Sequence, residues 1–83
     1  MNFIANINIM PRAELLDPQG KATILGLKNL GFDNVNNLRI GKRIYLEIEA
    51  ESREIAEMEV KQSCEKLLAN LIMESYEYEL VEG

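Results

Sequence analysis

The side chains that could carry out chemistry are unevenly represented in these 83 residues: there are fourteen Asp and Glu, one Cys and no His. Without histidine the chain cannot form a Ser–His or Cys–His nucleophile pair or a His-ligated metal site. Cys64 lies in the apolar stripe of a predicted helix, which indicates a buried structural thiol. A single cysteine forms no internal disulfide and no thiolate zinc site, which suits a reducing compartment. We therefore expect no catalytic residue and no metal site.

The acidic residues could supply a carboxylate pair, but general acid catalysis needs a desolvated carboxyl beside a second group. Most of them fall on the predicted exposed faces of one helix and two strands, where carboxylates solubilise a protein. Against nine Lys and Arg they leave a net charge of −5, which disfavours binding to nucleic acid or to an anionic membrane. Gly41-Lys42 lacks the glycine-rich approach of a phosphate-binding loop.

One segment is more specific than its predicted local structure requires: LLDPQG, residues 15–20. Asp17 is a good helix N-cap because its carboxylate can accept free amide hydrogens of the first turn, and Pro18 suits the first helical position. Gln19 is not needed for either purpose, and Gly20 weakens a helix. The segment is either a helix start alone or a contact element.

A second segment, LRIGK at residues 38–42, has the same ambiguity. Gly41 predicts a tight turn. Arg39, Lys42 and Arg43 place three cations within five residues of an acidic chain, which makes a local positive patch. A solvated turn and a partner-docking site both remain open.

The first half of the chain predicts a strand, a helix and a further pair of strands. Residues 2–10 alternate, and one side of this predicted strand carries Phe3, Ala5, Ile7 and Ile9. A helix is expected from Pro18, with Gly31 as its left-handed C-terminal cap; its apolar side carries Ile24, Leu27 and Leu30. Residues 34–50 predict a hairpin at Gly41. Its first strand carries Leu38 and Ile40 on one side, and its second carries Ile44, Leu46, Ile48 and Ala50.

The second half predicts one helix and one strand. Ser52 is the expected N-cap, and Asn70 is expected to close the helix in the left-handed conformation. The apolar stripe of this helix is Ala56, Val60, Ser63, Cys64, Leu67 and Leu71. In the final strand, residues 72–80, Tyr76 and Tyr78 could face either side of the sheet.

The order β-α-β-β-α-β predicts an α+β ferredoxin-like sandwich: four antiparallel strands with two helices on one face. We expect one domain over residues 1–83. The other sheet face, with Ile4, Met10 and Tyr45, would stay open, and together with unpaired edges this favours self-association. No apolar run is long enough for a membrane span, and the N-terminus lacks the features of a signal peptide, so we expect a cytoplasmic protein.

Four strings at consistent spacing resemble the PurS family, the small subunit of phosphoribosylformylglycinamidine synthase. They are LLDPQG (15–20), LRIGK (38–42), CEKLLAN (64–70) and ESYEYELVE (74–82). The resemblance spans nearly the whole chain. The departures are Asn6, Asn8 and Asn36-Asn37, which leave open which face of the first strand docks on partners.

The resemblance implies a role in de novo purine synthesis, in which the synthase converts formylglycinamide ribonucleotide to its amidine with ATP and glutamine. A synthetase subunit (PurL) holds ATP, magnesium and the ribonucleotide, and a glutaminase subunit (PurQ) releases ammonia. PurS carries no active site or cofactor, forms dimers that can pair into tetramers, and bridges the other two subunits.

By resemblance, the partner-binding residues of this chain form two elements: Asp17, Pro18, Gln19 and Gly20 in one, and Arg39, Gly41 and Lys42 in the other. The alternative function is a small regulatory module that binds a metabolite, because ferredoxin-like folds host many functions.

Overall fold

The computed structural model describes residues 1–15 and 17–83, so Leu16 of the LLDPQG string lies outside the described residues. The elements in chain order are β1 (Asn2–Pro11), α1 (Pro18–Asn29), β2 (Lys42–Glu49), α2 (Arg53–Ser63), the π-helical turn η1 (Cys64–Leu68) and β3 (Glu74–Glu82). The described strands form one sheet in the order β2-β1-β3, with β1 antiparallel to both neighbours. The α+β class and the antiparallel sheet are confirmed.

The hydrophobic core lies between the sheet and α2. The predicted inner side of β1 is buried as expected, with at most 1% exposure for Phe3, Ala5, Ile7 and Ile9. The register places Ile44, Leu46 and Ile48 of β2 beside them, and Tyr76, Tyr78 and Leu80 of β3 on the other side. Ala56, Val60 and Cys64 of α2 and η1 complete the cluster. The sheet with α2 and η1 is called the body below.

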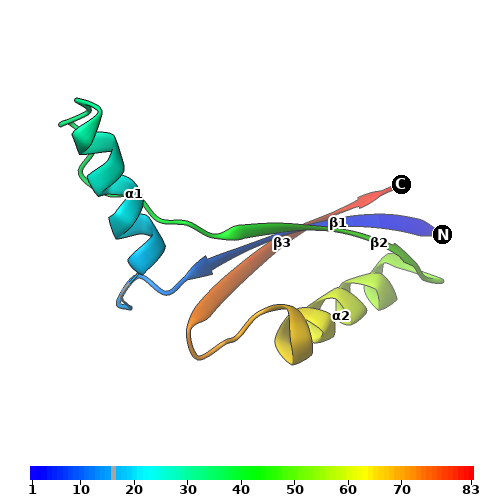
Figure 1. The fold of residues 1–83 in the computed structure, drawn as a ribbon. Coiled ribbons are helices and arrows are strands. Elements are labelled where there is room, and N and C mark those ends of the chain that lie inside the picture. Colours follow the sequence, from blue (N-terminus) through cyan, green and yellow to red (C-terminus); the bar gives the residue numbers. More distant parts are fainter. Residues whose placement is uncertain (16) are drawn as a thin grey trace.

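The expected fourth strand and its hairpin at Gly41 are wrong for the described chain. Residues 35–41 form no strand, and Gly31, with φ of 96°, is the only described residue at positive φ. Gly41 therefore makes no reversal, and an irregular segment leads directly into β2 (Figure 1). The alternation of Leu38 and Ile40 was correct as a pattern, but a pattern does not show whether a neighbouring strand is present.

The expectation that both helices cover one sheet face is also wrong. Only α2 lies along the sheet, whereas α1 projects from the end of the sheet opposite to the two termini (Figure 1). Leu25 within α1 is 63% exposed, and Leu30, which directly follows the helix, is 74% exposed. We call residues 18–40 the arm. Because the arm stands apart from the body, the radius of gyration is 16.5 Å, against about 12 Å for a compact domain of this length.

The helix-start predictions are confirmed. Asp17 accepts a hydrogen bond from the Gly20 N–H at 3.1 Å, and Ser52 accepts one from the Ile55 N–H at 3.2 Å. Gly31 follows the end of α1 at positive φ, as expected for a residue that can leave a helix without steric penalty.

The end of the second helix differs from the prediction. Its last turn is the π-helical η1, whose wider turn shifts the helical register, and Leu67 is therefore turned outward and is 83% exposed. Asn70 does not adopt the left-handed conformation. The open question about Tyr76 and Tyr78 is settled by the register, which puts both on the α2 side of the sheet.

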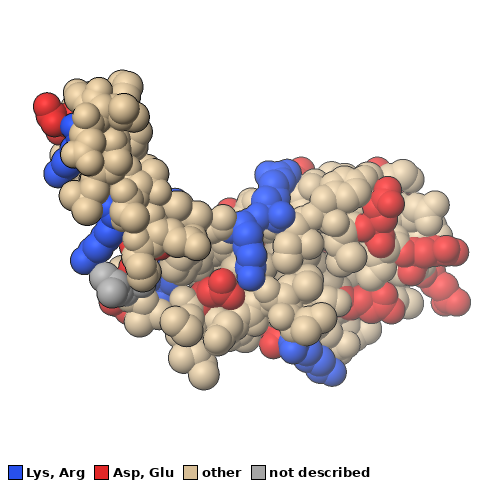
Figure 2. Space-filling view, viewed as in Figure 1, with Lys and Arg blue, Asp and Glu red and all other residues tan. Residues whose placement is uncertain are grey.

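The open sheet face carries Ile4, Met10 and Tyr45 as expected, with Tyr45 61% exposed. Asn6 and Asn8 form its centre. Acidic side chains of the outer strands share this face: Glu47, Glu49, Glu77 and Glu79. In Figure 2 acidic side chains gather at the end of the body farther from the arm.

Candidate partner-docking site at the arm root

The two segments that stood out in the sequence meet in space where the arm leaves the body. Asp17, Pro18 and Gln19 from the first segment and Gly41 and Lys42 from the second line one cavity of about 560 Å³. The remaining lining residues are Pro11, Leu15, Ile40, Asn70, Met73 and Glu74. Of the seven predicted contact residues, five therefore share this cavity, and Gly20 and Arg39 lie in the backbone junction beside it.

Asp17 ties the start of α1 to the chain just before β2. Its Oδ1 accepts from the Gly20 N–H and its Oδ2 accepts from the Ile40 N–H, each at 3.1 Å. These hydrogen bonds, first that from Gly20 and then that from Ile40, lower the pKa of the Asp17 carboxyl below its ordinary value, with a smaller contribution from the charge of Arg39. The carboxylate is therefore ionised at neutral pH and is engaged within the chain.

Three further residues hold the same junction together. Arg39 donates a hydrogen bond to the Pro11 carbonyl at the end of β1. A Cβ at Gly20 would overlap the Leu38 carbonyl oxygen, and a Cβ at Gly41 would overlap the Ile9 carbonyl oxygen and the Met10 sulfur. The backbones pass so closely that only glycine fits at these two positions. Asp17, Gly20, Arg39 and Gly41 together are called the arm root.

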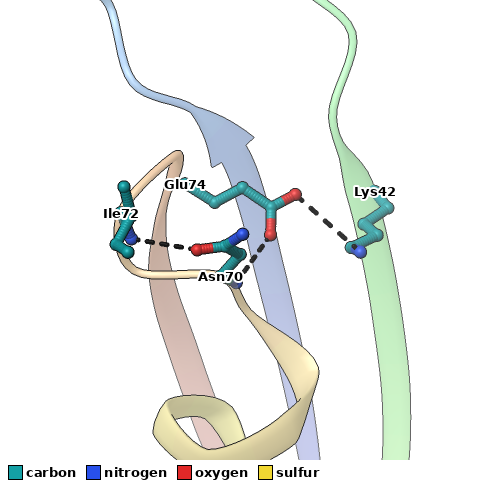
Figure 3. Close-up of polar contacts among 4 residues, drawn as sticks. All are labelled: Lys42, Asn70, Ile72 and Glu74. Carbon is teal, nitrogen blue, oxygen red and sulfur yellow. Dashed lines mark hydrogen bonds and ion pairs between the residues drawn. The ribbon is translucent and has the colours of Figure 1, made fainter.

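The residues that remain available to a partner are Pro18, Gln19 and Lys42, which are exposed at the cavity mouth. Lys42 forms an ion pair with Glu74 at 3.8 Å (Figure 3). The same Glu74 carboxylate accepts from the Asn70 N–H at 2.8 Å. The positive patch predicted at Arg39, Lys42 and Arg43 is therefore partly neutralised on the cavity side.

The turn at residues 70–74 belongs to the site and was not predicted. Arg12 donates from Nε and Nη2 to the Leu71 carbonyl, at 2.9 and 2.6 Å. The Asn70 Oδ1 accepts from the Ile72 N–H at 3.1 Å (Figure 3). These bonds fix the turn while Ile72 and Met73 stay 84% and 55% exposed. The sequence pattern places Leu71 in the helix and begins the final strand at residue 72, which concealed the turn; β3 begins at Glu74.

The other chemically notable groups lie in the body. Cys64 is fully buried, and desolvation raises the pKa of its thiol. Desolvation, and then a 2.9 Å hydrogen bond to Glu65, raises the pKa of Tyr76 to about 12. The described residues contain no cluster of metal-ligating side chains. No described helix has the length and apolar character needed to cross a membrane.

Comparison with known protein families shows which family the chain belongs to. Residues 4–82 match the PurS family, described as phosphoribosylformylglycinamidine (FGAM) synthase. The chain belongs to the PurS family. PurS from Archaeoglobus fulgidus is 42% identical over 74 residues, which cover 89% of this chain and 92% of that protein. PurS from Bacillus subtilis is 42% identical over 80 residues, 96% of this chain and 94% of the relative. These relatives are named as subunits of FGAM synthase, a glutamine-hydrolysing ligase.

Solved PurS structures share the fold over almost the whole length. The B. subtilis PurS structure superposes with a TM-score of 0.88 at 38% identity, covering 96% of this chain and 99% of that one. A chain of the Thermotoga maritima PurLQS structure superposes with a TM-score of 0.89 at 37% identity, covering 98% and 99%. The resemblance stated from four short strings is thus confirmed over the full length.

Proposed function

We propose that this chain is the non-catalytic assembly subunit of FGAM synthase in purine biosynthesis, joining the PurL synthetase and PurQ glutaminase subunits. The observation that carries the proposal is the 0.89 TM-score, over 98% of this chain, to a chain of PurLQS from T. maritima. We propose that residues 1–83 act as one domain and that the chain also associates with itself, as a dimer that can pair into a tetramer.

The assembly role has a physical reason. Ammonia released in bulk water at neutral pH is protonated and loses its nucleophilicity. A subunit that holds the glutaminase against the synthetase keeps ammonia in a path that excludes water and preserves its reactive form. In this proposal ATP and Mg²⁺ bind to PurL and no cofactor binds to this chain, which works in the cytoplasm.

We place the contact with the larger subunits at the arm root cavity. Pro18, Gln19 and Lys42 are exposed at its mouth and would touch the partner. Asp17, Gly20, Arg39 and Gly41 contribute by fixing the backbone that presents those three side chains. Exposed Met73 in the cavity lining and exposed Ile72 next to it supply the apolar surface that such an interface needs.

Reconstitution tests the proposal. Purified PurL and PurQ should form amidine from glutamine only when this chain is added, whereas amidine formation from added ammonium salt should need the chain far less. Amidine formation from glutamine at full rate without the chain would contradict the assembly role.

A paired variant tests the location of the contact. Gln19→Ala with Lys42→Ala should weaken capture of PurL at least tenfold, because it removes two exposed contacts and leaves the internal bonds of the arm root intact. The matched control is Lys28→Ala, an exposed arm residue away from the cavity. Equal capture by both variants would move the contact elsewhere.

The cavity itself supports one other function, a regulatory site for a metabolite. It combines the apolar Pro11, Ile40 and Met73 with the polar Gln19 and Asn70, as small-molecule sites do. A thermal shift screen with amino acids and nucleotides separates the two: a ligand sensor would be stabilised by one compound, and an assembly subunit would not.

A further inference from the structure

The described sheet ends in two outer strands, β2 and β3, and each leaves one edge to which a further strand could be added. The register shows which backbone groups face the β3 edge. The Arg12 N–H donates to the Met73 carbonyl, one step beyond the end of the β1–β3 register, so hydrogen-bonded and non-bonded pairs alternate from there. The outward N–H and C=O groups of β3 therefore belong to its even-numbered residues, which are Glu74, Tyr76, Tyr78, Leu80 and Glu82.

Contacts within the chain already occupy outward groups toward both ends of β3. The Glu74 N–H donates to the Asn70 carbonyl at 2.6 Å. Near the other end, Nη2 of Arg53 donates to the Leu80 carbonyl, also at 2.6 Å. An incoming strand would have to replace both contacts in order to pair along the whole of β3. The chain therefore partly closes this edge itself.

Arg53 is held in the position that caps the Leu80 carbonyl. It is the first residue of α2, and Ser52 fixes the start of that helix by accepting a hydrogen bond from the Ile55 N–H. One turn later, Oε1 of Glu57 lies 3.9 Å from Nε of Arg53. A hydrogen bond from a charged donor is stronger than one from a neutral backbone amide. A competing strand would therefore exchange a strong contact at Leu80 for a weaker one.

Like charges on the open sheet face add a second obstacle to pairing at β3. Glu77 and Glu79 are exposed on this face, which points away from α2. Two copies of β3 related by a two-fold axis would run antiparallel, and the position of the axis decides which residues face each other. An axis at residue 77, 78 or 79 places Glu77 opposite Glu77, Glu77 opposite Glu79, or Glu79 opposite Glu79. Each of these central registers sets like charges directly opposite each other, which destabilises the pair of strands.

The outer edge of β2 has no comparable cap. The Ala50 N–H donates to the Met1 carbonyl, which fixes the alternation on this side of β1. The outward backbone groups of β2 therefore belong to Arg43, Tyr45, Glu47 and Glu49. Within the described part of the chain, no hydrogen bond is made to these outward groups. The two edges of the sheet are thus unequal, because only β3 is capped by a side chain from α2.

We propose that Arg53, Glu77 and Glu79 prevent β3 from accepting a strand of another chain; we call them the edge-protecting residues. A chain that can pair at a single edge forms an assembly of limited size, whereas a chain that pairs at both edges adds further chains without limit. The edge-protecting residues therefore set an upper limit on the number of chains that associate. The proposal goes beyond the proposed function, and its test uses the chain alone, so it can fail while binding to PurL and PurQ succeeds.

Analytical ultracentrifugation tests the limit on size. The variant Arg53→Met with Glu77→Gln and Glu79→Gln removes the protection but keeps the shape of the side chains. Its weight-average mass should continue to rise with concentration and exceed the plateau of the unchanged chain at least twofold. The matched control makes the same charge changes on the exposed side of α2 and should keep the plateau; it carries Lys61→Met, Glu54→Gln and Glu59→Gln.

Partial variants separate the two obstacles and keep the test valid if the triple variant does not fold. Arg53→Met alone, and Glu77→Gln with Glu79→Gln alone, should each raise the mass above the plateau. Arg53→Lys should keep the plateau, because an ammonium group can still donate to the Leu80 carbonyl. A plateau equal to that of the unchanged chain in both partial variants would overturn the proposal, as would an equal rise in mass in the α2 control.

Cross-linking tests whether the added chains join at β3. In the variant with Arg53→Met and Glu77→Gln, Glu79→Cys should be linked between copies by a short bismaleimide. The comparison keeps Glu79→Gln and places the thiol at Glu47→Cys, on the same face but on the opposite outer strand. Buried Cys64 is retained in both as an unreactive background. The yield of linked chains should be at least tenfold higher for Glu79→Cys, and equal yields would overturn the proposal.

Discussion

The body and the arm contain similarly apolar segments but bury them to very different extents. In β1 the inward residues Phe3, Ala5, Ile7 and Ile9 are at most 1% exposed. In the arm, Leu25 and Phe32 are 63% and 54% exposed. The body therefore has a hydrophobic core of its own, whereas the arm keeps its position through the hydrogen bonds and close backbone contacts of the arm root.

This difference separates stability from assembly within one small chain. Substitutions in the body should reduce the free energy of unfolding, and substitutions in the arm should mainly change association.

The largest effect is expected in the core. Ile7→Ala removes a fully buried side chain at the centre of the sheet and should cost about 3 kcal/mol of unfolding free energy, measured by urea denaturation. The matched arm variant Leu25→Ala should change the same free energy by less than about 0.5 kcal/mol. Similar losses for both variants would show that the arm takes part in a common core.

Gly41 at the arm root and Gly26 in the arm should respond in opposite ways to replacement by alanine. Gly41→Ala drives a Cβ into the Ile9 carbonyl oxygen and should destabilise the fold by about 2 kcal/mol. Gly26→Ala within α1 meets nothing within 4 Å and should stabilise the helix by about 1 kcal/mol. Thermal unfolding of the two variants gives the sign of each effect. An unchanged unfolding temperature for Gly41→Ala would mean that the backbone at the arm root can shift to make room for the added Cβ.

Removal of each N-cap should destabilise only the region that contains its helix. Ser52→Ala removes the acceptor for the Ile55 N–H and should lower global stability by about 1 kcal/mol. Asp17→Ala should instead accelerate amide exchange within α1 and leave exchange in the body unchanged. Faster exchange throughout the body of Asp17→Ala would contradict the independence of the two regions.

The smallest effect is a pH dependence confined to the arm root. Because hydrogen bonds lower the pKa of Asp17 from its ordinary 3.8, its contribution to stability is complete above that value and is lost as the pH falls through the lowered one. NMR titration from pH 6 to 2 should show Gly20 and Ile40 amide shifts that follow this loss. Asp17→Asn, which still accepts hydrogen bonds but does not titrate, should lack the transition.

The sequence predicted the elements of the body well because local rules decide them. The alternation in β1 and the cap at Ser52 depend on neighbours within a few residues. The period of a regular helix places Leu67 in the buried stripe, but the π-helical turn η1 breaks that regularity.

The position of the arm could not be predicted in the same way. The sequence shows an apolar side on α1 and on residues 38–40, but it does not show which surface, if any, that side packs against. At the candidate site, the sequence singled out two segments that meet at the arm root. It gave no sign of Arg12 and Glu74, because their contacts depend on the tertiary structure.

The hydrogen bond between Tyr76 and Glu65 also provides an intrinsic spectroscopic probe. The chain has three tyrosines and no tryptophan, so its near-ultraviolet absorbance comes from phenol rings. Neutral Tyr76 favours the closed seam between η1 and β3, a preference that is complete below the ordinary pKa of 10 and disappears as the pH rises toward 12. Because Tyr45 and Tyr78 also ionise at alkaline pH, the difference in phenolate absorbance between this chain and its Tyr76→Phe variant isolates the ionisation of Tyr76, without any added label.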